Sequence, residues 1–351
     1  MLDKKIILNK ILNNIRLTSN GSIVASPTKN NPNYFYHWIR DSALTMKVII
    51  KEYELTSNPV YLDIILKYVN YEYNLQKLNS LSGLGEPKYN TNTTTFNDSW
   101  GRPQNDGPAL RSTNMINISR LLKSNFNNVV EKMIEPIIEK DLEYVLANYD
   151  KQSFDLWEEK HGYHFYTRIV QAKFLKEAIK YFERSEYKQY LKNLLELIKH
   201  HFDSNFIISS FDCNGSILRI DDSSIFMGIV HIDFDEDIVP LNKYYLIQNN
   251  INSLLQYFNE KYNGKYNFIG RYKFDEYFNG QSWIICTINM LTFFKHLKVN
   301  QNISNKILDQ ILTINPDLNL NEQYDPKEKK QYSVEQLTWN YTEMYLFISK
   351  V

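Results

Sequence analysis

The amino-acid sequence predicts an all-α fold, an (α/α)6 barrel of about twelve helices. Apolar residues recur with a helical period along most of the chain, and few stretches alternate as strands do. The connections between the helices alternate between long and short. Because antiparallel helices joined in sequence place every odd-numbered connection at the same end, the long odd-numbered loops share one face. We expect the active site on that face.

Twelve segments carry the helical period. Residues 129–135 also fit it, and Pro136 then either kinks that helix or opens a new one, of which we favour the second. The predicted helices span residues 3–17, 42–55, 60–78, 107–124, 136–147, 165–182, 187–202, 222–232, 240–260, 281–297, 304–313 and 333–348.

The gaps between these segments alternate regularly between long and short. Six helix pairs joined by alternating gaps predict a ring, although periodicity alone does not separate a ring from a less symmetric helical bundle. The long gaps lie near residues 18–41, 79–106, 148–164, 203–221, 261–280 and 314–332, and the short ones near 56–59, 184–186 and 298–303.

Composition favours a soluble globular protein, and a chain of 351 residues can form one large helical domain. Lysine plus arginine equals aspartate plus glutamate at 40 each, so no basic field exists to attract nucleic acid or an anionic membrane. The two cysteines lack CxxC spacing and are expected to be free thiols. No signal-peptide core and no membrane-spanning run are present in this sequence.

The first long loop places Trp38, Arg40 and Asp41 just ahead of a helix. An Asp at such a position is by itself most often an N-cap. An Arg and an Asp beside clustered rings can also grip vicinal hydroxyl groups, because each offers paired hydrogen bonds.

The second long loop supplies Trp100 and Arg102 among turn-forming Gly and Pro residues. Gly83 and Gly85 suggest a phosphate-binding loop, but the third glycine, the helix start and the P-loop lysine are missing.

The third long loop contains DLWEEKHG, residues 155–162, with three carboxylates close to Trp157. Crowded carboxylates raise one another's pKa, so a glutamate here is placed to stay protonated and act as a general acid. A WEE triplet taken alone is more often a solvated helix start than part of a catalytic site. The last long loop holds Glu322 between Asn321 and Gln323.

Seven stretches, occurring in the family's order between about residues 10 and 348, resemble the signatures of fungal-type glucoamylases of glycoside hydrolase family 15. They are ASPTKNNPNYFYHWIRDSAL, GLGEPKYN, SWGRPQNDGPALR, DLWEEKHG, GRYKFDEYFNGQSW, NEQYD and SVEQLTWNY.

This resemblance implies an exo-acting, inverting hydrolase. It would release β-D-glucose from the non-reducing ends of α-1,4-glucans, and more slowly from α-1,6 linkages. Glu158 falls on the general acid and Glu322 on the general base, a pair expected to stand roughly 6.5–9.5 Å apart. The resemblance leaves as alternatives another inverting α-glucoside hydrolase of trehalase or isomalto-dextran type, and a catalytically inactive carbohydrate-binding relative.

The resemblance also implies which residues bind sugar. It places Arg40 and Asp41 on the 4- and 6-hydroxyls of the terminal glucose and Arg271 on its 2- and 3-hydroxyl side. Trp100 would buttress the acid and Asp155 would belong to its network. The other implied site residues are Tyr34, Trp38, Arg102, Leu156, Trp157, Glu159, Asp275, Trp283 and Tyr324.

The chain departs from the family pattern at Lys273 and Phe274, where a Pro-Glu pair is usual, and no starch-binding domain is expected. We expect one catalytic domain over residues 1–351, an intracellular location, a monomer, and α-glucan oligosaccharides and polysaccharides as partners rather than nucleic acid or membrane. No cofactor or metal is expected, because the pairs His161–His164 and His200–His201 lack further ligands at suitable spacing.

Overall fold

The computed structural model describes residues 3–264 and 266–349, and most of them are helical. Within this part of the chain, twelve α-helices of eight residues or more form the scaffold, as the sequence predicts. They are α1 (Lys4–Ile15), α2 (Ile39–Thr56), α3 (Pro59–Leu75), α4 (Gly107–Leu122), α6 (Glu135–Asn148), α7 (Phe165–Phe182), α8 (Lys188–Lys199), α9 (Ser224–His231), α10 (Tyr244–Lys261), α11 (Ile284–Leu297), α12 (Gln301–Ile314) and α13 (Thr338–Ser349).

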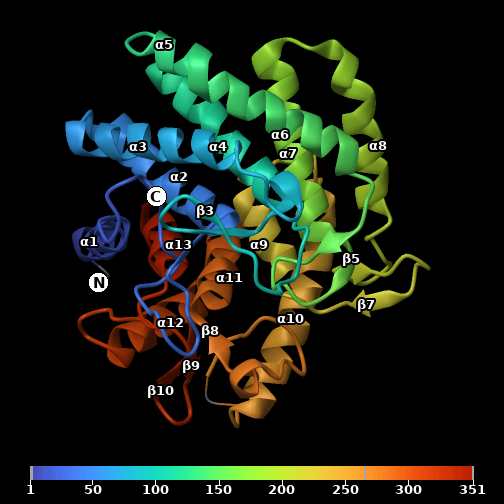
Figure 1. Cartoon of the computed structure of the whole chain (residues 1–351). Coiled ribbons are helices and arrows are strands. Elements are labelled where there is room, and N and C mark those ends of the chain that lie inside the picture. Colours follow the sequence, from blue (N-terminus) through green and yellow to red (C-terminus); the bar gives the residue numbers. More distant parts are fainter. Residues whose placement is uncertain (1–2, 265, 350–351) are drawn as a thin grey trace.

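Six helices form a closed inner ring. Helices α2, α4, α7, α9, α11 and α13 pack against one another in this order, and α13 packs back against α2. The outer helices α3, α6, α8, α10, α12 and α1 pack in turn on α2, α4, α7, α9, α11 and α13 (Figure 1). The predicted (α/α)6 barrel is confirmed.

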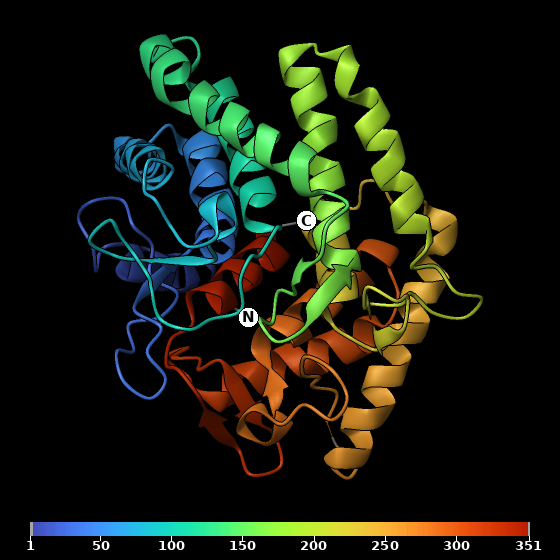
Figure 2. The same cartoon turned by 45° about the vertical axis from the view of Figure 1, so that its right-hand side comes forward.

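Burial separates inner from outer helices. All residues from Ile284 to Phe294 of α11 are buried, whereas α8 buries only Leu194 and Ile198. A helix that is apolar all round belongs in the interior, and one with a narrow apolar stripe covers a surface. In Figure 2, α7 and α8 lie side by side at the upper right as such a pair.

Two local predictions change at the helix ends. Helix α2 begins at Ile39 with Trp38 in the N-cap position, so Asp41 lies inside the first turn and does not cap the helix. Pro136 is the second residue of α6, which continues without a break from α5 (Asn127–Val129) and a π-helical turn at Val130–Ile134. Helix α6 therefore begins one residue before Pro136, and it is continuous with the helical segment that precedes it.

Three small antiparallel sheets link the long connections in pairs. Their strands are two to four residues long, too short for an alternating pattern to reveal. One sheet joins the first two long connections with β1 (Tyr36–Trp38), β2 (Lys88–Asn90) and β3 (Thr94–Thr95). The second joins the next two with β4 (Ser153–Phe154), β5 (His161–His164), β6 (Ser210–Phe211) and β7 (Ile217–Arg219), and the third joins the last two with β8 (Ser282–Trp283), β9 (Gln323–Asp325) and β10 (Lys330–Tyr332).

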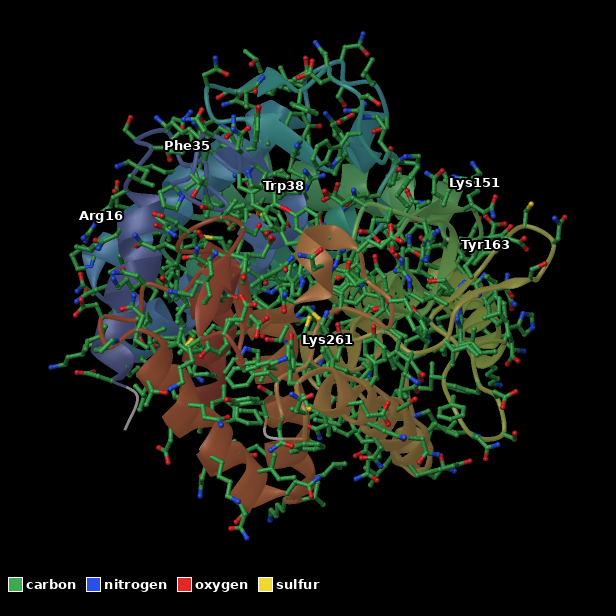
Figure 3. All side chains as sticks on the ribbon, turned by 90° about the horizontal axis from the view of Figure 1, so that it is seen from below. Arg16, Phe35, Trp38, Lys151, Tyr163 and Lys261 are labelled. Carbon is green, nitrogen blue, oxygen red and sulfur yellow. The ribbon has the colours of Figure 1, made fainter. Side chains whose placement is uncertain are left out.

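Seen from below, Trp38 lies in the upper central part of the outline, whereas Arg16 and Lys151 lie toward its left and right edges (Figure 3). Cys213 and Cys286 are both free thiols, as expected. Within residues 3–264 and 266–349, none of the helices combines the length and the apolar character that a bilayer span requires.

Candidate active site

A pocket of about 350 Å³ opens where the long connections meet. Among the described residues, five of the six long connections contribute to its wall, and residues 203–221 do not. Its lining consists of Ala25, Pro32, Tyr34, Trp38, Arg40, Asp41, Trp100, Gly101, Leu156, Trp157, Glu158, Glu159, Arg271, Tyr277, Trp283, Glu322, Leu337 and Trp339. The two glutamates that the sequence singles out therefore face the same cavity.

The carboxyl group of Glu158 is held by donors on both oxygens. The indole N–H of Trp38 donates to Oε1 at 2.7 Å and that of Trp100 donates to Oε2 at 2.7 Å. The amide of Gln104 also donates to Oε1, at 3.0 Å. These three contacts fix the direction of the carboxyl group toward the pocket.

The backbone at Glu158 adopts a left-handed conformation, with φ of 68°. A non-glycine residue in this region costs about 1–3 kcal/mol, which the surrounding structure must supply. Gly101 packs against this turn so closely that an added Cβ would stand 2.5 Å from the Glu158 carbonyl oxygen. A side chain at position 101 would therefore displace the turn that carries Glu158.

The carboxylates beside Glu158 do not crowd it, contrary to the sequence argument. Asp155 accepts a hydrogen bond from Arg219 at 2.9 Å, and Glu159 pairs with Arg271 at 2.7 Å. Their charges are therefore offset by arginines from distant segments, and the acids of this stretch are not packed against one another without partners. Crowding within the WEE triplet is thus the wrong reason for choosing Glu158.

Glu322 lies buried in the last long connection, directly before β9, and is 2% exposed. Its Oε2 accepts a hydrogen bond from the Ser333 hydroxyl at 2.5 Å. Burial raises the pKa of Glu322 to about 7, although the Ser333 hydroxyl, the Arg271 charge and the Tyr34 hydroxyl favour the ionised form. The group can therefore exchange a proton near neutral pH.

Arg40 and Asp41 lie side by side at the start of α2, both buried. Arg40 Nη1 donates to Gln104 at 3.0 Å and to Asp106 at 2.8 Å, while its Nε has no hydrogen-bond partner among the described residues. Burial raises the pKa of Asp41 to about 7, with a further contribution from Glu158. The Arg40 guanidinium and the Asp41 carboxyl group line the same pocket side by side, an arrangement that suits a ligand with neighbouring hydroxyls.

Arg271 also lines the cavity. Asp275 accepts from its Nε at 2.8 Å and from its Nη2 at 2.7 Å, a two-point contact that fixes the guanidinium plane. The guanidinium lies 5.5 Å from the Trp157 ring centroid and 5.0 Å from that of Trp283. The cavity thus combines fixed charges with aromatic walls, as sugar sites do.

The sequence model of glycosyl hydrolases family 15 matches residues 3–296. The chain belongs to this family. The intracellular sporulation-specific glucoamylase of Saccharomyces cerevisiae is 36% identical to it over 208 residues, which is 52% of this chain and 37% of that protein. Glucoamylase-1 of Schizophyllum commune is 30% identical over 291 residues, 77% of this chain and 50% of that protein.

A solved glucoamylase structure from Hormoconis resinae superposes with a TM-score of 0.87 at 27% identity, covering 99% of this chain and 72% of that one. The chain spans about a third of the length of the Saccharomyces relative and half of the Schizophyllum relative. The fold and the family therefore agree with the resemblance seen in the sequence.

Four residues that the sequence predicts for the site do not line the pocket described above. Arg102 pairs with Glu86 at 2.9 Å, and the Tyr324 ring packs against Phe268. Asp155 forms an ion pair with Arg219, and Asp275 forms one with Arg271. Each supports neighbouring segments instead of facing the cavity. The other predicted site residues, Glu158, Glu322, Tyr34, Trp38, Arg40, Asp41, Trp100, Leu156, Trp157, Glu159, Arg271 and Trp283, all line it.

Sequence reasoning missed several residues of the site. Tyr277 lines the pocket, and its hydroxyl lies 3.4 Å from that of Tyr34 and 3.2 Å from that of Ser333. Trp339 forms part of the wall, and its indole N–H donates to buried Glu343 at 2.8 Å. Both residues lie within quoted signatures, Trp339 in SVEQLTWNY and Tyr277 in GRYKFDEYFNGQSW, so the signal was present but neither residue was singled out.

The predicted absence of a metal site stays a prediction. In the parts of the chain that the structure describes, no three His, Cys, Asp or Glu side chains are grouped as metal ligands would be. His164 and His201 are buried among backbone and hydroxyl partners.

Proposed function

We propose that this chain is an exo-acting, inverting glucoamylase that releases β-D-glucose from the non-reducing ends of α-1,4-glucans, and more slowly from α-1,6 linkages. The observation that carries the proposal is that Glu158 and Glu322 line the same pocket. Glu158 accepts a hydrogen bond from an indole N–H, and Glu322 accepts one from a serine hydroxyl. Two carboxyl groups flanking a glycosidic bond are what this hydrolysis requires. The glucoamylase names of the relatives support α-glucans as the substrate class.

Glu158 is the proposed general acid. Its carboxyl group is aimed into the pocket by the indoles of Trp38 and Trp100, so it can deliver a proton to the glycosidic oxygen as the bond to the anomeric carbon breaks. Glu322 takes a proton from a water molecule that attacks the same carbon from the opposite face. The bond forms opposite to the bond that breaks, and the configuration inverts.

Exo action follows in this proposal from the charged pair at the start of α2. Buried Arg40 and Asp41 offer a donor and an acceptor to two neighbouring hydroxyls, and the non-reducing end of an α-1,4-glucan presents a free 4-hydroxyl that an internal glucose lacks. Arg271, held by Asp275, would bind the other side of the same ring. The intracellular location, the monomeric state and the single-domain organisation stay predictions.

The stereochemistry of the first product tests this function. With maltose as substrate, proton NMR recorded before mutarotation should show β-glucose as the released anomer. Release of α-glucose would mean a double displacement and a wrong role for Glu322. Parallel assays with isomaltose and trehalose separate a glucoamylase from the isomalto-dextran and trehalase alternatives.

The Ser333→Ala variant should shift the pH dependence in a known direction. The Ser333 hydroxyl is one of the groups that hold the pKa of Glu322 down, so its loss raises that pKa further above the usual carboxyl range. The base must be ionised to work, and kcat/KM reports the free enzyme. The acidic limb of kcat/KM for maltose should therefore move to higher pH, whereas Ser204→Ala, an exposed control, should leave it in place.

A further inference from the structure

The fourth long connection, residues 203–221, raises a question because it alone contributes no wall to the described pocket. It is nevertheless tied to the third connection through the pairing of β5 with β6. Strand β7 ends at Arg219, and the side chain of Arg219 is only 9% exposed. A buried arginine needs carboxylate partners, and those partners lie directly behind Glu158.

Arg219 binds three carboxylates from two segments. Its Nη1 donates to Asp155 Oδ2 at 2.9 Å and to Asp222 Oδ2 at 3.0 Å. Its Nη2 donates to Glu159 Oε2 at 3.2 Å. The guanidinium also stacks over the Tyr272 ring, 3.6 Å from the centroid. These contacts use the planar fork of arginine, which lysine does not possess.

Asp155 links Arg219 to the turn that contains Glu158. Its Oδ1 accepts from the backbone N–H groups of Glu159 at 2.8 Å and Lys160 at 3.0 Å. Its backbone carbonyl accepts from the N–H of Glu158 at 2.9 Å. Both ends of the Asp155 carboxylate are thus occupied, one by the turn and the other by Arg219.

The other two carboxylates hold the residues on either side of Glu158. Asp222 Oδ1 accepts from the indole N–H of Trp157 at 2.9 Å. Glu159 Oε1 pairs with Arg271 at 2.7 Å, so Glu159 bridges the two arginines. Trp157, Glu158 and Glu159 are consecutive, and Arg219 reaches the first and the last of them through one carboxylate each.

We propose that Arg219 is a positioning residue for Glu158, which keeps the left-handed turn and thereby the direction of the acid toward the glycosidic oxygen. This inference rests on the proposed function. Arg219 does not line the pocket, so it acts through Asp155, Asp222 and Glu159. Without the forked guanidinium, the three carboxylates could not all keep a cationic partner, since Arg271 pairs with Glu159 alone among them, and their repulsion would open the turn.

Two substrates separate acid positioning from general damage. Maltose needs a proton on its leaving oxygen, whereas α-glucosyl fluoride releases fluoride with little help from an acid. Both need the same base and the same sugar contacts. For Arg219→Met, kcat on maltose should fall about 10–100-fold, since a small misplacement of a catalytic group has effects of this size. The kcat on the fluoride should change by about threefold or less.

A milder variant and a rescue experiment cover the case in which Arg219→Met does not fold. Arg219→Lys keeps the charge without the fork, and it should show the same selective loss on maltose. Arg219→Ala leaves a cavity of guanidinium shape, so added guanidinium at millimolar concentration should restore part of its maltose activity but none of that of Glu158→Gln. Arg184→Met, at the short connection between α7 and α8, is the control and should match the parent enzyme on both substrates.

The outcomes distinguish this inference from the function on which it rests. If Arg219→Lys loses both substrates equally, or neither, Arg219 does not position the acid. If the parent protein hydrolyses neither maltose nor the fluoride, the proposed function itself is wrong.

Discussion

The Glu158→Gln variant should hydrolyse maltose roughly 10²–10⁴-fold more slowly than the parent, with little change in substrate affinity. The substitution keeps the size of the side chain but removes the transferable proton. It should retain much of its activity on α-glucosyl fluoride, whose leaving group needs no acid. Steady-state kinetics on the two substrates measure both effects.

The amide that replaces the carboxyl group in this variant would not reproduce every contact of the acid, because it offers only one acceptor oxygen to the indoles of Trp38 and Trp100. Some loss on the fluoride is therefore compatible with the role of Glu158. Glu143→Gln, at an exposed position of α6, is the matched control and should behave as the parent. Parent-like hydrolysis of maltose by Glu158→Gln would mean that another group is the acid.

The Glu322→Gln variant should lose activity on both substrates, again by roughly 10²–10⁴-fold in kcat. Attack by water requires a base whichever leaving group departs, so kcat on α-glucosyl fluoride should fall as well. Binding of maltose should persist, because Glu322 is expected to contact the water and not to hold the sugar.

The contrast between the two variants is the informative result. A loss on maltose alone identifies the acid, and a loss on both substrates identifies the base. Glu335→Gln, exposed in the same long connection, is the control for Glu322→Gln. If Glu322→Gln hydrolyses the fluoride at the parent rate, Glu322 is not the base.

Much of the fold was predictable from local sequence. The helical period located all twelve helices, although several starts shifted, as at Ile39 of α2 and Thr338 of α13. The alternation of long and short gaps predicted the ring, because it depends only on the direction of successive helices. The short strands were not predictable, since two to four residues carry no readable alternation.

The pocket was predictable only in part. Motifs located Glu158 and Glu322 because their neighbours in sequence form the signatures. The environment of each acid was not predictable, because the groups that decide it are not its sequence neighbours: Arg219 lies 64 positions from Asp155, and Ser333 lies 11 positions from Glu322.

Sequence patterns alone thus determined the helical barrel, the face that carries the long loops and the identity of the two candidate glutamates. Tertiary structure decided which side chains reach the cavity and which charges are paired. Tyr277 lines the pocket and Tyr324 does not, and the acids beside Glu158 pair with arginines. The physical reason is that periodicity is a property of neighbours along the chain, whereas side-chain direction and pKa depend on groups brought close only by folding.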